Sequence, residues 1–373
     1  MKAKILKLFK KLSDGILLYI PQLLFGIIAP ILIYQYENAA QNMLGFYTAT
    51  FGIGLLSSGY ANTCQYLTRR EDSHNSIFGF YNSYIISRFV LLSPLFVIDV
   101  NFVVFEFTYT KLLIVFIILG SLPSWGFLFL LGKRKLPIFL AWLETILKIS
   151  ILAYVLEQQL PVWYFVVGTV VINIFITLYV ILKYKSKEIM KLRAFLQNYI
   201  PFITSGVLFS LSWLTFMSIV LVNYTHTSTI VVFLERTLRI LERASAVITT
   251  VLFRKDNNVY LTSGVKTKFK AIIKWSLMPV VVFSLVGSIY WQQHAVFFIL
   301  CIINVLIGQL AQQLFNPNRW YNLGGVLAAL TLLLPIIFIP KAELYGFELF
   351  TLGTLLNYLI RRSSLLSNTK GQQ

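Results

Sequence analysis

Charged side chains are scarce in this sequence. Asp, Glu, Lys and Arg make up 12% of its 373 residues, whereas 57% are hydrophobic, and the mean hydropathy is +0.75. A water-soluble domain needs more charged surface than this composition supplies. Apolar runs of roughly 18–25 residues recur along the chain instead, and each is long enough to cross about 30 Å of hydrocarbon. The composition therefore predicts an all-α polytopic membrane protein.

Residues that bind metals or perform catalysis are also few. Two cysteines are too few for a disulfide framework, and the three histidines lie far apart without the spacing of metal ligands. The sequence has no Gly-rich nucleotide-binding loop, no HExxH or GxSxG motif, and no pair of catalytic carboxylates. We therefore expect a protein that is not an enzyme and that uses no metal or cofactor.

The apolar runs divide into about twelve transmembrane helices joined by short connections. The longest connection, 254–270, has about seventeen residues, so no folded domain fits outside the membrane. The basic N-terminus resembles the start of a signal peptide, but the apolar segment after it is too long, so we expect a retained first span. The expected spans are 15–35, 44–64, 77–98, 111–132, 137–156, 162–183, 199–223, 229–253, 271–291, 295–315, 322–340 and 343–360.

The basic residues predict the orientation in the membrane. Of the 32 Lys and Arg, 25 lie in the termini and even-numbered loops, two lie in the opposite loops, and five lie within spans. Under the positive-inside rule, both termini are then cytoplasmic. The net charge of +18 is thus first a signal of topology, and no nucleic-acid partner is expected. Contact with anionic lipid head groups is the more natural second role of these charges.

An internal repeat predicts two halves. The sequence YIPQLLFG at 19–26 recurs as YIPFITSG at 199–206, and two shorter basic matches have nearly the same offset. The repeat coincides with a division of the spans into six and six. We therefore expect two six-helix bundles, 1–195 and 196–373, related by a pseudo-two-fold axis along the membrane normal. Transporters with such repeats place their binding site between the halves.

Five charges interrupt the predicted eighth span. On a helix with about 100° per residue they occupy one arc of about 120°. Five central charges cost on the order of 12–17 kcal/mol on the translocon scale, whereas the apolar residues contribute roughly 4–8 kcal/mol to insertion. The charged stripe must therefore face the bundle interior or a wet cavity. Its members are Glu235, Arg236, Arg239, Glu242 and Arg243.

Three further charges fall inside predicted spans: Arg88 in the third, and Glu144 with Lys148 one turn apart in the fifth. Ion pairing between helical neighbours is one interpretation, above all for Glu144 and Lys148. A substrate path is the other, because buried charges in membranes commonly mark one. The eight charges within spans sum to +2, which suits an anionic substrate such as a phosphate.

These charges divide into two groups of candidate site residues. The candidate substrate-binding residues are Arg88, Lys148, Arg236, Arg239 and Arg243. The candidate residues for ion pairing or ion coupling are Glu144, Glu235 and Glu242.

The pattern resembles a known family. The segments that carry the resemblance are YIPQLLFGIIAPILI in the first span, the run from Leu44 to Arg70, LGSLPSWGFLFLLGKRKLPIF from Leu119, and the charged helix from Phe233 to Lys255. Together they resemble the polysaccharide (O-antigen) flippases of the multidrug/oligosaccharidyl-lipid/polysaccharide (MOP) exporter superfamily. The chain departs from that family in being short, and the connection between the ninth and tenth expected spans, around 291–295, is shortened.

The resemblance implies a MATE-like fold and a transporter of the bacterial inner membrane. Such a protein moves an undecaprenyl-diphosphate-linked oligosaccharide, the repeat unit of a polysaccharide, from the cytoplasmic to the periplasmic leaflet by alternating access. The resemblance also makes a gradient of H⁺ or Na⁺ a candidate driving force. Other membrane proteins of glycan assembly are candidate partners.

Two other functions remain open. A multidrug exporter of the same superfamily would bind organic cations, for which an acidic cavity is expected, whereas the buried charges here are net basic. A lipid-linked glycan polymerase or ligase resembles other such enzymes in carrying a long periplasmic loop. No outward loop here exceeds about a dozen residues. Both features favour a flippase.

The first testable prediction concerns topology. We expect both termini and the loops at 69–76, 133–135, 183–193 and 254–270 to be cytoplasmic. Single cysteines introduced at these positions should resist a membrane-impermeant maleimide added to intact cells, whereas Gln158→Cys in an outward loop should react. Labelling of Ser263→Cys from the periplasm would contradict the twelve-span topology.

Overall fold

The computed structural model describes residues 2–36, 39–57, 59–68, 73–104, 107–123, 125–161 and 163–203, with a few single positions beyond them. Most of the predicted second half, including the eighth span, therefore lies outside the described residues. The elements are α1 (Lys2–Tyr34), α2 (Ala39–Ser57), α3 (Tyr60–Leu67), α4 (Ser73–Leu92), η1 (Ser93–Phe96), β1 (Asn101–Val104), β2 (Phe107–Thr110), α5 (Lys111–Gly120), α6 (Phe127–Leu130), α7 (Lys135–Glu157) and α8 (Trp163–Tyr184). A further helix occupies 192–203.

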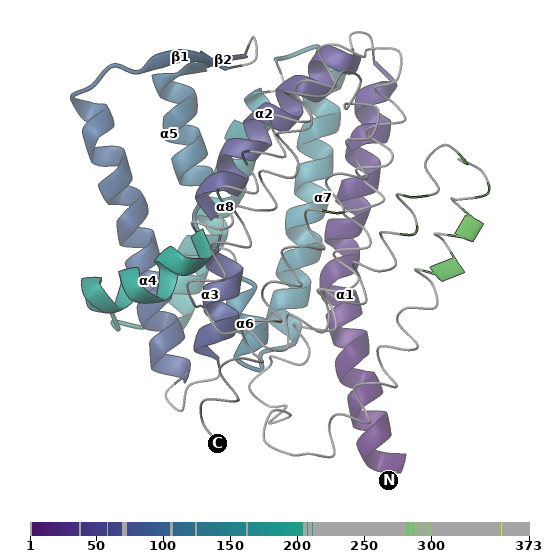
Figure 1. The fold of residues 1–373 in the computed structure, drawn as a ribbon, viewed down its shortest axis with the longest axis vertical. Helices are drawn as coiled ribbons and strands as arrows, with labels where there is room; N and C mark the ends of the chain where they lie inside the picture. The colour runs from purple at the N-terminus through teal and green to yellow at the C-terminus, as the bar shows by residue number, and fades with distance from the viewer. Residues whose placement is uncertain are drawn as a thin grey trace.

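The long helices form a bundle. Figure 1 shows the N-terminus of α1 at one end of this bundle and the strands β1 and β2 at the other. Helix α1 packs on α7, and α8 packs on α5 and α7. Three described helices are long and apolar enough to cross a membrane: Ser13–Tyr34 within α1, α7 and α8. These helices coincide with the first, fifth and sixth predicted spans.

Two of the other predicted spans are interrupted. The second span is divided between α2 and α3, and the fourth is divided between α5 and α6. The third continues from α4 into the short 3-10 helix η1. The described half is thus mostly helical and follows the predicted order of spans. The total of twelve spans and the pseudo-two-fold symmetry of two bundles stay predictions.

The expectation of an all-α chain is wrong at one place. Strands β1 and β2 form an antiparallel hairpin with Asn101 opposite Thr110 and Val104 opposite Phe107. The physical reason is local, because 101–110 reads NFVVFEFTYT and is dense in β-branched and aromatic residues. Thr110 then caps α5, since its side chain accepts a hydrogen bond from the Leu113 backbone N–H.

The break between α2 and α3 is made by Gly59. Its φ of +79° is a left-handed conformation that side chains disfavour. A Cβ at this position would lie 2.7 Å from the backbone nitrogen of Ile203, so only a glycine lets the helix at 192–203 approach so closely. That helix runs across α4 and α3 (Figure 1) and begins seven residues before the predicted seventh span. The domain boundary predicted at 195/196 lies within this helix, and the division into two domains stays a prediction.

Replacing Gly59 should be more harmful than replacing another left-handed glycine. Gly132 has a φ of +87° but open space where a Cβ would lie. Alanine costs roughly 1–2 kcal/mol at either site through backbone strain. Only Gly59→Ala also pushes the Ile203 backbone away, so it should lower the unfolding temperature in detergent clearly further than Gly132→Ala. Equal decreases in the two variants would contradict a close approach of the helix at 192–203 to Gly59.

Candidate functional site

A cavity of about 300 Å³ lies within the described bundle, among α1, α2, α7 and α8. Both charged residues of the fifth predicted span line it, together with amide, hydroxyl and aromatic side chains. These lining residues are Glu144 and Lys148; Gln22, Thr50, Thr145 and Thr169; and Phe25 and Phe165. The mixture of an ion pair, hydrogen-bonding groups and aromatic faces suits an amphipathic ligand.

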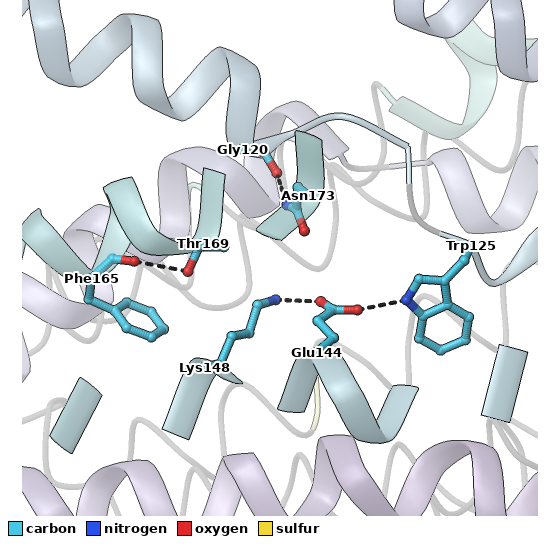
Figure 2. Close-up of polar contacts among 7 residues, drawn as sticks. All are labelled: Gly120, Trp125, Glu144, Lys148, Phe165, Thr169 and Asn173. Atoms are coloured by element: carbon cyan, nitrogen blue, oxygen red, sulfur yellow. Dashed lines mark hydrogen bonds and ion pairs between the residues drawn. The ribbon is translucent and has the colours of Figure 1, made fainter. Parts of the chain in front are cut away.

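The ion pair forms along one face of α7. The Lys148 Nζ atom lies 2.5 Å from Glu144 Oε1, at the i, i+4 spacing that the sequence indicated. Both side chains are largely shielded, with 21% and 18% of their surface exposed. The second carboxylate oxygen of Glu144 accepts a 2.7 Å hydrogen bond from the Trp125 indole N–H (Figure 2). Glu144 is therefore held at both oxygens.

Trp125 reaches Glu144 because the fourth span is broken. Helix α5 ends at Gly120, and α6 begins only at Phe127. The side-chain amide of Asn173 on α8 donates a 2.7 Å hydrogen bond to the Gly120 carbonyl at this break, as Figure 2 shows. The carbonyl at the helix end thus gains a partner from a neighbouring helix.

The sequence interpretation missed Trp125 and Asn173. One available signal is the run LPSWG at 122–126, because proline and glycine together interrupt a helix. No pattern in the sequence links that run to Glu144. The partners come from helices that meet only in the folded bundle.

The remaining wall of the cavity is aromatic and hydroxylated. The rings of Phe25 and Phe165 stack with centroids 5.9 Å apart and planes 11° apart. Thr50 and Thr169 donate to the carbonyls of Phe46 and Phe165, at 2.7 and 3.0 Å. A hydroxyl that donates within its own helix still has oxygen lone pairs, so both threonines can accept from a ligand.

Arg88 lies elsewhere. It is 3% exposed and is not part of the cavity lining. Its guanidinium donates to the Leu56 carbonyl at 2.8 Å and to the Tyr199 hydroxyl at 3.1 Å, and it lies 4.1 Å from the centroid of the Tyr84 ring. The Arg88 side chain thus reaches from α4 to the end of α2, where it also contacts the helix at 192–203.

The other candidate charges fall outside the described residues. These are the members of the eighth-span stripe, Glu235, Arg236, Arg239, Glu242 and Arg243. Of the candidate site residues, the structure brings Glu144 and Lys148 together and keeps Arg88 apart from them.

Comparison with known proteins shows the fold. No protein family and no curated protein matches this sequence. Solved structures do match along almost the whole chain. A crystal structure of a mutant MATE is 13% identical, with a TM-score of 0.62, and the match covers 98% of this chain and 97% of the other. A multidrug resistance MATE family transporter of the MOP superfamily, in an outward-facing conformation, is 13% identical with a TM-score of 0.59 and coverage of 97% and 96%.

A third match is a MOP superfamily transporter from Pyrococcus furiosus, described as having a binding pocket of reverse polarity that suggests a different function. It is 11% identical, has a TM-score of 0.60, and the match covers 97% of this chain and 95% of the other. At such low identities the likeness concerns the fold and not the substrate. This chain has the fold of the MATE and MOP superfamily transporters.

Proposed function

We propose that this protein is a flippase. It moves a lipid-linked oligosaccharide diphosphate across the bacterial inner membrane by alternating access. The fold of MOP superfamily transporters and the apolar helices support a membrane transporter. The cavity in the described half supports an amphipathic ligand, because it combines charge, hydroxyls and aromatic faces.

The hydrogen bonds of the Glu144–Lys148 pair favour an anionic ligand over a cationic one. Glu144 keeps the Trp125 indole as a partner when Lys148 turns away from it. Lys148 has three N–H donors, and within the described residues its hydrogen bond is to Glu144. A diphosphate oxygen can therefore approach the Lys148 ammonium without leaving the carboxylate unpartnered. A cation that approaches Glu144, in contrast, is repelled by the Lys148 ammonium already bonded to the carboxylate.

Two predictions from the sequence also favour an anionic, diphosphate-containing substrate. The charged stripe of the predicted eighth span would add Arg236, Arg239 and Arg243 to a cavity between the halves. Arginine binds phosphate in a bidentate geometry that lysine lacks. The resemblance to polysaccharide flippases implies this substrate class, with both termini cytoplasmic and an H⁺ or Na⁺ gradient as a candidate driving force. Of the three carboxylates that are candidates for ion coupling, Glu144 lies in the part of the chain that the structure describes.

Export of an organic cation is the second candidate. The Glu144 carboxylate lies in the same cavity as the stacked rings of Phe25 and Phe165, and cations bind to such combinations. One solved structure of this fold is a multidrug resistance transporter, and another is described as having reverse pocket polarity. The two functions differ in which member of the ion pair the substrate needs.

Transport by purified protein in vesicles tests the proposal. The substrate is a fluorescent polyprenyl-diphosphate oligosaccharide, whose arrival in the other leaflet is read by chemical quenching. Lys148→Met should lower its rate about tenfold or more, because a charge-assisted hydrogen bond contributes roughly 1.5–3 kcal/mol. The double variant Glu144→Gln/Lys148→Met should accumulate normally, since it strands no charge, but stay as slow as Lys148→Met. Lys135→Met, an exposed lysine of the same helix outside the cavity, is the matched control.

Two results would contradict a flippase of this kind. If Glu144→Gln stops transport of an organic cation while Lys148→Met has no effect on the diphosphate, the protein is a cation exporter. If the double variant moves the diphosphate at the full rate, the cavity of Glu144 and Lys148 is not on the substrate path.

A further inference from the structure

The segment that follows α8 is held against α4 by several hydrogen bonds. After α8 ends at Tyr184, the Asn82 side-chain amide donates to the carbonyls of Ser186 and Glu188, at 3.0 and 2.7 Å. The Met190 N–H donates to the Gly79 carbonyl at 3.2 Å. The described part of this connection is therefore fixed against α4.

The helix at 192–203 continues this attachment through one face. Phe195, Tyr199 and Phe202 on that face are 5%, 6% and 1% exposed. Phe195 stacks on Phe80 with ring centroids 5.4 Å apart. The Tyr199 hydroxyl accepts from Arg88 and donates to the Leu56 carbonyl at 3.2 Å. These contacts fix the rotation of the helix about its own axis.

Because the rotation is fixed, a second face points away from the bundle. It carries Leu192, Leu196 and Ile200, which are 72%, 40% and 48% exposed. These positions recur at i, i+4 and i+8 and so form a continuous aliphatic stripe. Arg193 and Gln197 follow at its edge, and the same residues border a shallow groove of about 470 Å³.

The residues around this stripe are basic. Lys185, Lys187, Lys191 and Arg193 are all exposed, and the same stretch holds one acidic residue, Glu188. An exposed aliphatic stripe flanked by Lys and Arg is the pattern of a helix that lies in the plane of a membrane surface. Its position fits, because α8 is long and apolar enough to cross a membrane and ends at Tyr184, just before this segment.

We propose that the outward face of the helix at 192–203, with the basic stretch at 185–193, is a docking surface for anionic phospholipids. The aliphatic stripe enters the boundary between head groups and acyl chains, while the lysines and Arg193 contact lipid phosphates. The lipid thereby holds the connection to the second half at a fixed depth. This proposal does not depend on the substrate of the transporter.

Spin labels on neighbouring positions test the insertion of the stripe. Nitroxides are attached at Leu196→Cys and, as the matched control, at Gln197→Cys, in full-length protein with Cys64→Ala and Cys301→Ala, reconstituted in phosphatidylglycerol vesicles. The label at 196 should collide more with oxygen, which concentrates in lipid, and the label at 197 more with a water-soluble nickel chelate. A label at 196 that meets mainly the nickel chelate contradicts the proposal. A label shielded from both reagents contradicts it too, because another part of the chain or a second copy then covers the stripe.

Lipid-dependent stability tests the charge requirement with other variants. Phosphatidylglycerol added to the detergent-purified protein should raise its unfolding temperature more than phosphatidylcholine does. The double variant Lys187→Gln/Lys191→Gln should lose about half of that increase or more, because each lysine near an anionic surface adds to the attraction. Lys133→Gln/Lys135→Gln, which removes two exposed lysines just before and at the start of α7, should keep most of it. Equal losses in the two variants would mean a general charge effect and would overturn the assignment.

Discussion

Polar backbone groups inside hydrocarbon need partners within the protein, and the described half of this chain is arranged around that constraint. Two of its spans are broken, and each break is closed by side chains from other helices. Arg88, Tyr84 and Tyr199 all bond to the Leu56 carbonyl near the first break. Asn173 bonds to the Gly120 carbonyl at the second. The helix at 192–203 packs against the first break, and the second break places Trp125 within hydrogen-bonding distance of Glu144.

Much of this half could be predicted from the sequence because length and apolarity suffice for an uninterrupted span. Helices α7 and α8 agree with the expected fifth and sixth spans, and the i, i+4 spacing of Glu144 and Lys148 placed them within reach of each other. The breaks could not be predicted in the same way. Their closing partners, such as Asn173 and Tyr199, are more than 50 residues away in sequence from the carbonyls they bind. The hairpin after η1 has a local signal in its β-branched and aromatic residues, which the length and apolarity of a segment alone do not reveal.

In the candidate site, too, contacts within one helix could be predicted from the sequence, whereas contacts between helices could not. A pattern along one helix indicated the ion pair, but it could not show that Trp125 holds the free oxygen of Glu144. That contact changes the chemistry of the cavity, because it leaves the ammonium as the more available member of the pair. Arg88 illustrates the opposite case. As a buried arginine it was a candidate for substrate binding, and the structure shows it bonded to a helix end and to Tyr199. Its part in substrate binding stays a prediction.

The proposed flippase requires the cavity of Glu144 and Lys148 to receive an anionic head group. Competition binding to the purified protein can test this requirement, with undecaprenyl diphosphate and a lipophilic organic cation offered together and the bound species identified by native mass spectrometry. We expect the diphosphate to be retained, excess cation not to displace it, and Lys148→Met to release it. Retention of the cation in its place, with release on Glu144→Gln, would mean that the cavity binds a cation and not an anion.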